Sequence, residues 1–244
     1  MRANYLAADR PDIQFACKEL ARTMSEPSQS DWEALKRLGR YLKGRPRLVI
    51  RYKFQEPVTY LDAWTDSDWA GCVKTRKSTN GALLHGSHLI KSWSSTQSTI
   101  ALSSGEAEFY GIVEGAAVIL GHVSLMKDLG IEIKARVRTD ATTGKAICSR
   151  RGLGKTRHIH TQYLWIQERV QCRDIELVKV STNDNVADLL TKHLEQSKVN
   201  DFSERLCCET SEDRHALAPR SQTDMEEVIH TFTAFLLEQF GTTA

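Results

Sequence analysis

The N-terminal part of the chain carries apolar residues at helical spacing in two successive segments. Residues 11–24 begin with a proline, which suits the first turn of a helix, and continue with an apolar residue every three or four positions. The second segment starts at Asp31, which we expect to cap it, and ends at Gly44 and Pro46. The pattern predicts a helical hairpin that is too small to fold alone.

Strand-like segments follow. Residues 48–54 and 58–65 are rich in Val, Ile, Tyr and Thr, which predicts two strands. Residues 81–86 and 88–95 predict a pair of strands around a Gly-Ser turn.

A long helix is expected over residues 103–129. Ser103 or Ser104 is placed to cap it, Glu106 stands where a capping box needs a carboxylate, and Gly130 suits the helix end.

The rest of the chain alternates between strands and helices. We expect a strand at 134–140, a helix from about 142, a helix at 160–171, a strand at 175–181 and a final helix at 184–194. A run of strands followed by this alternation predicts an α/β fold with a mixed sheet and helices on its faces. Beyond it, residues 225–240 form an amphipathic helix candidate, and no structure is assigned to 207–223.

Composition places the chain among ordinary intracellular globular proteins. Its 244 residues are 41% hydrophobic and 26% charged. No apolar run approaches the roughly eighteen residues of a membrane helix, and the first residues show no signal-peptide pattern, so no membrane partner is expected. In a reducing compartment the six cysteines are free thiols.

The net charge of +2 is unevenly distributed. Residues 1–57 carry 12 Lys or Arg against 7 Asp or Glu, residues 58–195 carry 17 against 15, and residues 196–244 carry 4 against 9. A basic front and middle suit a protein that binds a polyanion, although solvated surfaces would have the same composition.

Four acidic residues stand where strand ends and helix starts are expected to converge. They are Asp66, Glu108, Asp140 and Asp188. Ligands of open sheets usually bind at that edge. Four carboxylates there would repel one another unless cations neutralised them, and ligation by oxygen alone suits Mg²⁺ or Mn²⁺. Two such ions about 4 Å apart can activate water and stabilise a leaving oxygen, which is the chemistry of a nuclease. Taken singly, each of the four is more often an ordinary turn or helix residue.

Several long motifs resemble one family. In order, they are YLAADRPDI, DWEALKRLGRYLKG, TDSDWAGCVKTRKSTNGALLHG, IKSWSSTQSTIALSSGEAEFYG, KTRHIHTQYLWIQE and DNVADLLTKHL. Over about residues 4–195 they resemble the C-terminal part of copia-type Pol polyproteins of LTR retrotransposons. That resemblance implies an RNase H-like mixed five-stranded sheet with helices on both faces, preceded by a helical hairpin. It divides the chain into a helical connector (1–57) resembling the end of the reverse transcriptase region, an RNase H-like domain (58–195) and an acidic tail (196–244), partly helical or disordered.

The same resemblance implies an activity. The family's RNase H hydrolyses the RNA strand of an RNA–DNA hybrid during reverse transcription, with two Mg²⁺ or Mn²⁺ ions held by an Asp–Glu–Asp–Asp set. Asp66, Glu108, Asp140 and Asp188 match that set. The implied partners are the hybrid and the upstream reverse transcriptase domain, without a membrane or a small-molecule substrate. The implied location is the cytoplasm, within a virus-like particle, or the nucleus.

Two motifs each offer two carboxylates. Asp66 matches the family position better than Asp68, which the strand period would place on the same face. Glu106 and Glu108 lie about 200° apart around a helix, so both cannot face one site. The apolar stripe of the helix runs closer to Glu108, which leaves Glu106 the capping role.

The sequence departs from the family pattern at several positions. Asp140 is followed by Ala-Thr-Thr where Asn-Gln-Ser is usual, Cys72 replaces a common Asp, and Gly105 replaces a common Thr. No histidine lies between the last strand and Asp188, so a proton-shuttling histidine is missing there. A catalytically inactive, nucleic-acid-binding transposon remnant therefore stays an alternative. Another RNase H-like enzyme, such as an integrase, is a third interpretation, against which the upstream hairpin argues.

Basic residues near these carboxylates are candidates for binding the hybrid. They are Lys74, Arg76, Lys77, Lys145, Arg150, Arg151, Lys155 and Arg157. Gly152 and Gly154 would let the backbone approach a phosphate, and such contacts give affinity without sequence specificity. His158 and His160 with Cys148 or Cys172 fit no zinc-finger spacing.

Overall fold

The computed structural model describes residues 2–86 and 88–211. It opens with α1 (Arg2–Ala8), α2 (Pro11–Arg22) and α3 (Gln29–Gly44), and α2 and α3 are the two helices expected from the sequence. Helix α1 is an addition that the apolar pattern did not indicate. The expected helix candidate at 225–240 lies outside the described residues.

The start of α3 differs from the expected one. The N-cap is Ser28, whose hydroxyl accepts the Asp31 N–H at 3.4 Å, while the Asp31 carboxylate accepts the Ser28 N–H at 2.8 Å. The expectation that Asp31 caps the helix is therefore wrong. Asp31 is the third helical residue of a reciprocal capping box, because its carboxylate reaches back to the cap.

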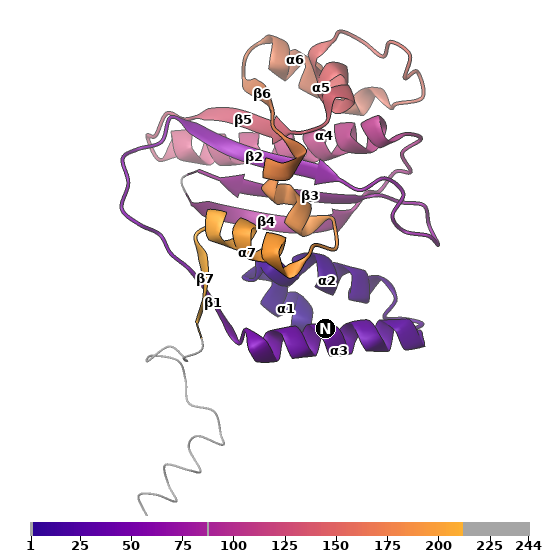
Figure 1. The fold of residues 1–244 in the computed structure, drawn as a ribbon. Helices are drawn as coiled ribbons and strands as arrows, with labels where there is room; N and C mark the ends of the chain where they lie inside the picture. Colours follow the sequence, from indigo (N-terminus) through magenta and orange to yellow (C-terminus); the bar gives the residue numbers. More distant parts are fainter. Residues whose placement is uncertain (1, 87, 212–244) are drawn as a thin grey trace, which may run out of the picture. The chain divides into compact units, whose positions relative to one another are not determined.

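A mixed five-stranded sheet forms the centre of the molecule. Its strands are β2 (Tyr60–Ser67), β3 (Thr79–His85), β4 (Leu89–Thr96), β5 (Lys134–Thr139) and β6 (Ile175–Lys179), in the order β4-β3-β2-β5-β6. Strands β2, β3 and β4 pair antiparallel, whereas β5 is parallel to both β2 and β6. This topology, with helices on both faces (Figure 1), confirms the RNase H-like fold class.

The two faces of the sheet are covered by different elements. Helices α4 (Ser104–Asp128), α5 (Thr142–Ser149) and α6 (Trp165–Gln171) lie on one side. On the other side lie α2, the short 3₁₀ helix η3 (Val186–Leu190) and α7 (Gln196–Arg205). The expected helix at 160–171 is split into a 3₁₀ turn, η1 (Thr161–Tyr163), and α6.

Two further expectations differ from the structure. The strand expected at 48–54 is shorter, β1 (Arg47–Ile50), and pairs outside the main sheet with β7 (Cys208–Ser211). The final helix expected at 184–194 is η3 with the turn η2 (Thr182–Asp184). It stays short because the Asn185 side chain caps it and 3₁₀-type bonds close it.

Helix α7, which lies beyond residue 195, belongs to the same core as η3. Phe202 and Leu206 of α7 are fully buried with Leu189 and Leu190, and Met1–Thr210 forms one compact unit. The division of the chain at residue 195 follows the family resemblance and stays a prediction.

Helix α4 supplies much of the main core. Its Phe109, Ile112, Ala116 and Ile119 have no exposed surface and pack on β2 and β5. By length and composition alone α4 is the one helix in the described part of the chain that could cross a membrane. Its buried residues lie between Gly105 and Ile119, whereas Leu125 near its end is exposed. The six cysteines are free thiols, as expected.

One glycine sets the distance between the sheet and η3. A Cβ at Gly81 would lie 2.7 Å from the Leu190 Cβ and 2.6 Å from the Thr191 Cγ2. Any side chain there would push η3 off strand β3, and η3 carries Asp188.

We expect Gly81→Ala to lower the free energy of unfolding by about 1–3 kcal/mol, because an added methyl overpacks this contact. Urea denaturation measures the change. The matched control is Gly121→Ala in α4, where a Cβ meets nothing within 4 Å. That change should raise stability by about 0.5–1 kcal/mol, since alanine has the higher helix propensity. Equal effects at both positions would contradict the close contact.

Candidate metal centre

Three carboxylates from three different elements meet beside the end of β2. Asp66 belongs to β2, Glu108 to the second turn of α4, and Asp140 follows β5 directly. One oxygen of each lies within 4.8 Å of the other two. The parallel register of β2 and β5 brings Asp66 and Asp140 to one end of the sheet, and the start of α4 adds Glu108. In the described part of the chain this is the only such group of His, Cys, Asp or Glu side chains.

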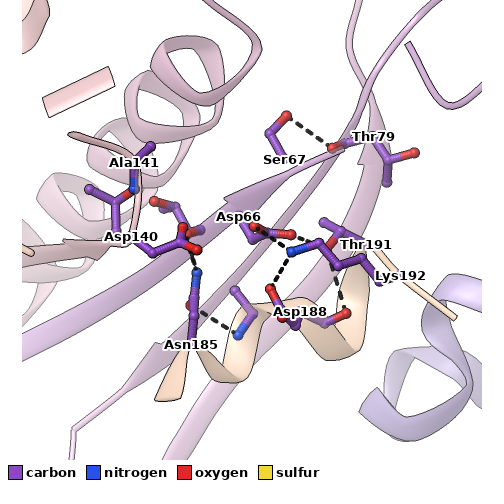
Figure 2. Close-up of polar contacts among 12 residues, drawn as sticks. Asp66, Ser67, Thr79, Asp140, Ala141, Asn185, Asp188, Thr191 and Lys192 are labelled. Atoms are coloured by element: carbon purple, nitrogen blue, oxygen red, sulfur yellow. Dashed lines mark hydrogen bonds and ion pairs between the residues drawn. The ribbon is translucent and has the colours of Figure 1, made fainter. Parts of the chain in front are cut away.

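Asp188 lies beside this group but outside it. Its Oδ1 is 2.7 Å from the Lys192 Nζ, and the same ammonium is 3.2 Å from the Asp66 Oδ1 (Figure 2). Of the four acidic residues expected from the sequence, three are therefore close enough for a shared ion. The fourth is ion-paired.

Polar neighbours fix two of the three carboxylates. The Thr191 hydroxyl donates to the Asp66 Oδ2. The Asn185 amide donates to the Asp140 Oδ1 at 3.4 Å and to the Thr65 carbonyl at 3.0 Å. Asn185 thus ties η3, β2 and Asp140 together (Figure 2).

Glu108 accepts a hydrogen bond from the Ser67 backbone N–H, but only one of its two oxygens has a partner. Its Oε2 is buried without a hydrogen-bond partner. Burial, followed by the charges of Asp66 and Asp140, raises the pKa of Glu108 well above its usual range. A buried carboxylate oxygen that faces two other carboxylates is what a divalent cation would satisfy. An all-oxygen set fits Mg²⁺ or Mn²⁺.

The pKa of Asp188 is also raised above its usual range. Burial and the Asp66 charge raise the pKa of Asp188, against the opposing effect of Lys192. Burial works to lower the pKa of Lys192, but the charges of Asp66 and Asp188 outweigh it and raise that pKa. The ammonium is therefore a fixed positive charge at neutral pH.

The structure separates the paired candidates. Asp68 lies just after β2, and its carboxylate accepts the Thr79 N–H at the start of β3. Asp68 lies outside the group of Asp66, Glu108 and Asp140, because β2 and its alternation of side chains end at Ser67. Glu106 accepts the Leu102 N–H at 3.0 Å and the Tyr110 hydroxyl at 2.7 Å, while the Ser103 hydroxyl caps the helix. Its support of the helix start comes through Leu102, one residue before the cap.

Two departures from the family pattern are neighbours in space. A Cβ at Gly105 would lie 2.4 Å from the Thr143 Cγ2. Threonine at 143 on α5 and glycine at 105 on α4 therefore fit each other. Asp140 keeps its place despite the altered residues after it.

The basic candidates fall into different surroundings. Arg150 is partly buried and donates to the Leu153 carbonyl and the Thr156 hydroxyl, so it holds its own loop together. Arg151 donates to Gln171 at 2.8 Å. Lys145 lines a hollow with Lys134 and Glu176. The exposed members are Lys74, Arg76, Arg151, Lys155 and Arg157, and Lys77 is half-buried.

The loop that carries Arg150, Arg151, Lys155 and Arg157 contains two glycines with positive φ. Gly152 and Gly154 have φ of +73° and +55°, which other residues rarely adopt. His158 in this loop lies 2.8 Å from the Glu106 carboxylate, so the loop is joined to the start of α4.

Sequence reasoning did not assign Thr191, Lys192 or Asn185. All three lie in the DNVADLLTKHL motif. The spacing of four between Asp188 and Lys192 is that of a helical ion pair and could have revealed the contact. The contact of Thr191 with Asp66 joins residues 125 positions apart, and local spacing does not reveal it.

Comparison with known proteins finds Pol polyproteins of transposons among the relatives of this chain. The Pol polyprotein from transposon RE2 of Arabidopsis thaliana is 34% identical over 206 residues, covering 83% of this chain. That from transposon TNT 1-94 of Nicotiana tabacum is 32% identical over 196 residues, covering 79%. Both are described as retrovirus-related, and the chain spans 14% and 15% of their lengths. No protein-family model matches. Among solved structures, the N-terminal RNase H domain of Rv2228c from Mycobacterium tuberculosis has a TM-score of 0.36 at 16% identity, over 61% of this chain and 98% of that one.

We expect the metal-free protein to lose stability as the pH rises above the usual range for a glutamate. The folded pKa of Glu108 is raised, so the native state holds a proton that the unfolded state has lost. That contribution is complete below the unfolded pKa and disappears as the pH rises through the folded pKa. Thermal unfolding from pH 5 to 9 in a chelator measures it. Glu108→Gln should flatten the profile, and an unchanged slope in that variant would contradict the assignment.

Proposed function

This chain belongs to the family of retrovirus-related Pol polyproteins from transposons, and from that premise we propose that it is the polyprotein's RNase H, which hydrolyses the RNA strand of an RNA–DNA hybrid. The observation that carries the proposal is the meeting of Asp66, Glu108 and Asp140 within 4.8 Å. Their placement at the end of parallel strands is where open sheets bind ligands.

The residues present fit divalent cations. Asp66, Glu108 and Asp140 would hold the first, and Asp188 lies close enough to contribute to a second. When bound, such ions supply the charge that activates water and stabilises the leaving oxygen of a phosphodiester. Water attack on phosphorus with loss of the 3′ oxygen would leave RNA with 3′-hydroxyl and 5′-phosphate ends.

Within this reaction the chain's own residues have distinct tasks. Thr191 holds Asp66, and Asn185 holds Asp140, so that neither carboxylate turns away from the group. Orientation of ligands by outer partners is worth about 10–100-fold in metal affinity or activity.

Exposed basic residues would hold the nucleic acid. Lys155 and Arg157 lie in the loop that His158 joins to the start of α4, and α4 carries Glu108. Lys74 and Arg76 lie in the loop between β2 and β3. Contacts of such residues with phosphates would hold a hybrid independently of its sequence, while RNA is recognised through its 2′-hydroxyl groups.

We expect Asp66→Asn to reduce the rate of RNA-strand cleavage more than about 100-fold. Changing an outer partner of a metal ligand costs about 10–100-fold in activity, and changing the ligand itself should cost more. Single-turnover cleavage of a labelled hybrid in Mg²⁺ measures the rate. The matched control is Asp68→Asn, two residues away and outside the group, which should retain most of the activity.

The proposal fails if the wild-type chain binds the hybrid and leaves both strands intact in Mg²⁺ and in Mn²⁺. That outcome would favour the non-catalytic binding remnant. Single-stranded RNA and double-stranded DNA serve as substrate controls.

A second expectation concerns binding. The double variant Lys155→Gln, Arg157→Gln should bind the hybrid more weakly than the wild type. The slope of log K against log salt concentration should fall in magnitude by about two, because each of the two residues would neutralise one phosphate. Fluorescence anisotropy at several salt concentrations gives the slope. A double variant on the exposed side of α3, Lys36→Gln with Arg40→Gln, makes the same change in net charge. If both pairs alter the slope equally, the loop has no special role.

A further inference from the structure

A lysine stands where two of the acidic residues meet. The Lys192 Nζ lies 3.2 Å from the Asp66 Oδ1 and 2.7 Å from the Asp188 Oδ1 (Figure 2). The two carboxylate side chains are 2% and 4% exposed, whereas that of Lys192 is 37% exposed. The ammonium thus reaches from the surface into a site from which water is largely excluded.

Local structure holds the ammonium in this position. The Lys192 N–H donates to the Asp188 carbonyl at 3.1 Å, which places the lysine side chain one turn after the Asp188 carboxylate. The hydroxyl of the preceding residue, Thr191, occupies the other oxygen of Asp66.

The site is consequently asymmetric. The Glu108 Oε2 is buried without a hydrogen-bond partner, and neither Glu108 nor Asp140 forms an ion pair with a side-chain cation of the described residues. Between Asp66 and Asp188 a positive charge is already present. Two like charges a few ångströms apart repel strongly in a poorly hydrated site.

We propose that Lys192 is a built-in counter-ion that takes the place of a second divalent cation between Asp66 and Asp188. This inference rests on the proposed function of the carboxylate group as a metal centre. The chain then binds one divalent ion tightly, at Asp66, Glu108 and Asp140. A second ion binds weakly until Lys192 moves aside. A substrate phosphate beside the site would favour that movement, because it offers the ammonium another anion.

The balance of charge supports this arrangement. Four ionised carboxylates carry four negative charges, and Lys192 with one divalent ion supplies three positive ones. A second divalent ion with Lys192 still in place would leave the site positively charged. Removing the lysine charge would make the second ion neutralise the site.

The test is the binding of Mn²⁺ to the full chain without nucleic acid, by calorimetry and by electron paramagnetic resonance of the free ion. Four proteins are compared: the wild type, Lys192→Met, Lys192→Arg and Lys198→Met. Lys198 is exposed on α7, so its variant removes one charge away from the carboxylates. Metal-free thermal unfolding shows that each variant is folded.

We expect one tight Mn²⁺ in the wild type, in Lys192→Arg and in Lys198→Met. Lys192→Met should bind a second ion about tenfold or more tightly than the wild type does. Without metal it should also unfold at a lower temperature, and Mn²⁺ should restore more of the difference than in the wild type.

The remaining outcomes are distinguishable. Two equally tight ions in the wild type, or an unchanged second site in Lys192→Met, would overturn the role of Lys192 and leave the proposed nuclease intact. If Lys192→Met does not fold, the wild-type stoichiometry alone decides between one tight ion and two. No Mn²⁺ bound to any folded variant would overturn both proposals.

Discussion

The repulsion between three clustered carboxylates, one buried and two half-buried, is the constraint on which this structure depends. Asp66, Glu108 and Asp140 are brought together by a parallel strand pair and the start of one helix. Among the ion pairs of the described residues, only Asp66 of the three has a side-chain cation, Lys192. The energetic consequence is a raised pKa at Glu108 and an oxygen without a partner. Perturbed pKa values of this kind cluster at functional sites.

The surrounding elements serve that centre. Segment 185–192 carries Asn185, Asp188, Thr191 and Lys192, each of which contacts an acidic residue of the site or is one. The segment is held against the sheet by the absence of a side chain at Gly81 and by the burial of Leu189 and Leu190 against Phe202. Residues that the sequence placed in an acidic tail therefore support the segment that carries Asp188.

The helical hairpin is also part of this assembly. Phe15 of α2 packs edge-on against His193, with ring centroids 4.9 Å apart, and Gln14 donates to the Ser92 carbonyl of β4 at 3.3 Å. His193 directly follows Lys192. The segment resembling the end of the reverse transcriptase region thus touches the chain one residue from Lys192, beside the carboxylate group.

Much of the fold followed from the sequence, because period and capping signals are local. The long helix and the five strands of the sheet were predicted in the correct order, and Ser103 is one of the two residues expected to cap the helix. Asp66 and Glu108 were preferred over Asp68 and Glu106, and the geometry groups the preferred pair with Asp140. Local patterns did not reveal that β1 pairs with β7, nor that Thr191 bonds Asp66, since these contacts join distant residues. The spacing of four residues predicts the ion pair between Asp188 and Lys192. The position of the ammonium between two carboxylates also requires Asp66, which lies beside that pair.

We propose that the carboxylate group makes this chain a nuclease for the RNA strand of a hybrid. The most direct test of this activity uses a hybrid with different fluorophores on its RNA and DNA strands, and adds Mg²⁺ to the metal-free wild-type chain. We expect the RNA to be cut into fragments with 3′-hydroxyl ends, only after Mg²⁺ is added, while the DNA stays whole. A hybrid that is bound but uncut, or cut equally in both strands, would contradict this proposal.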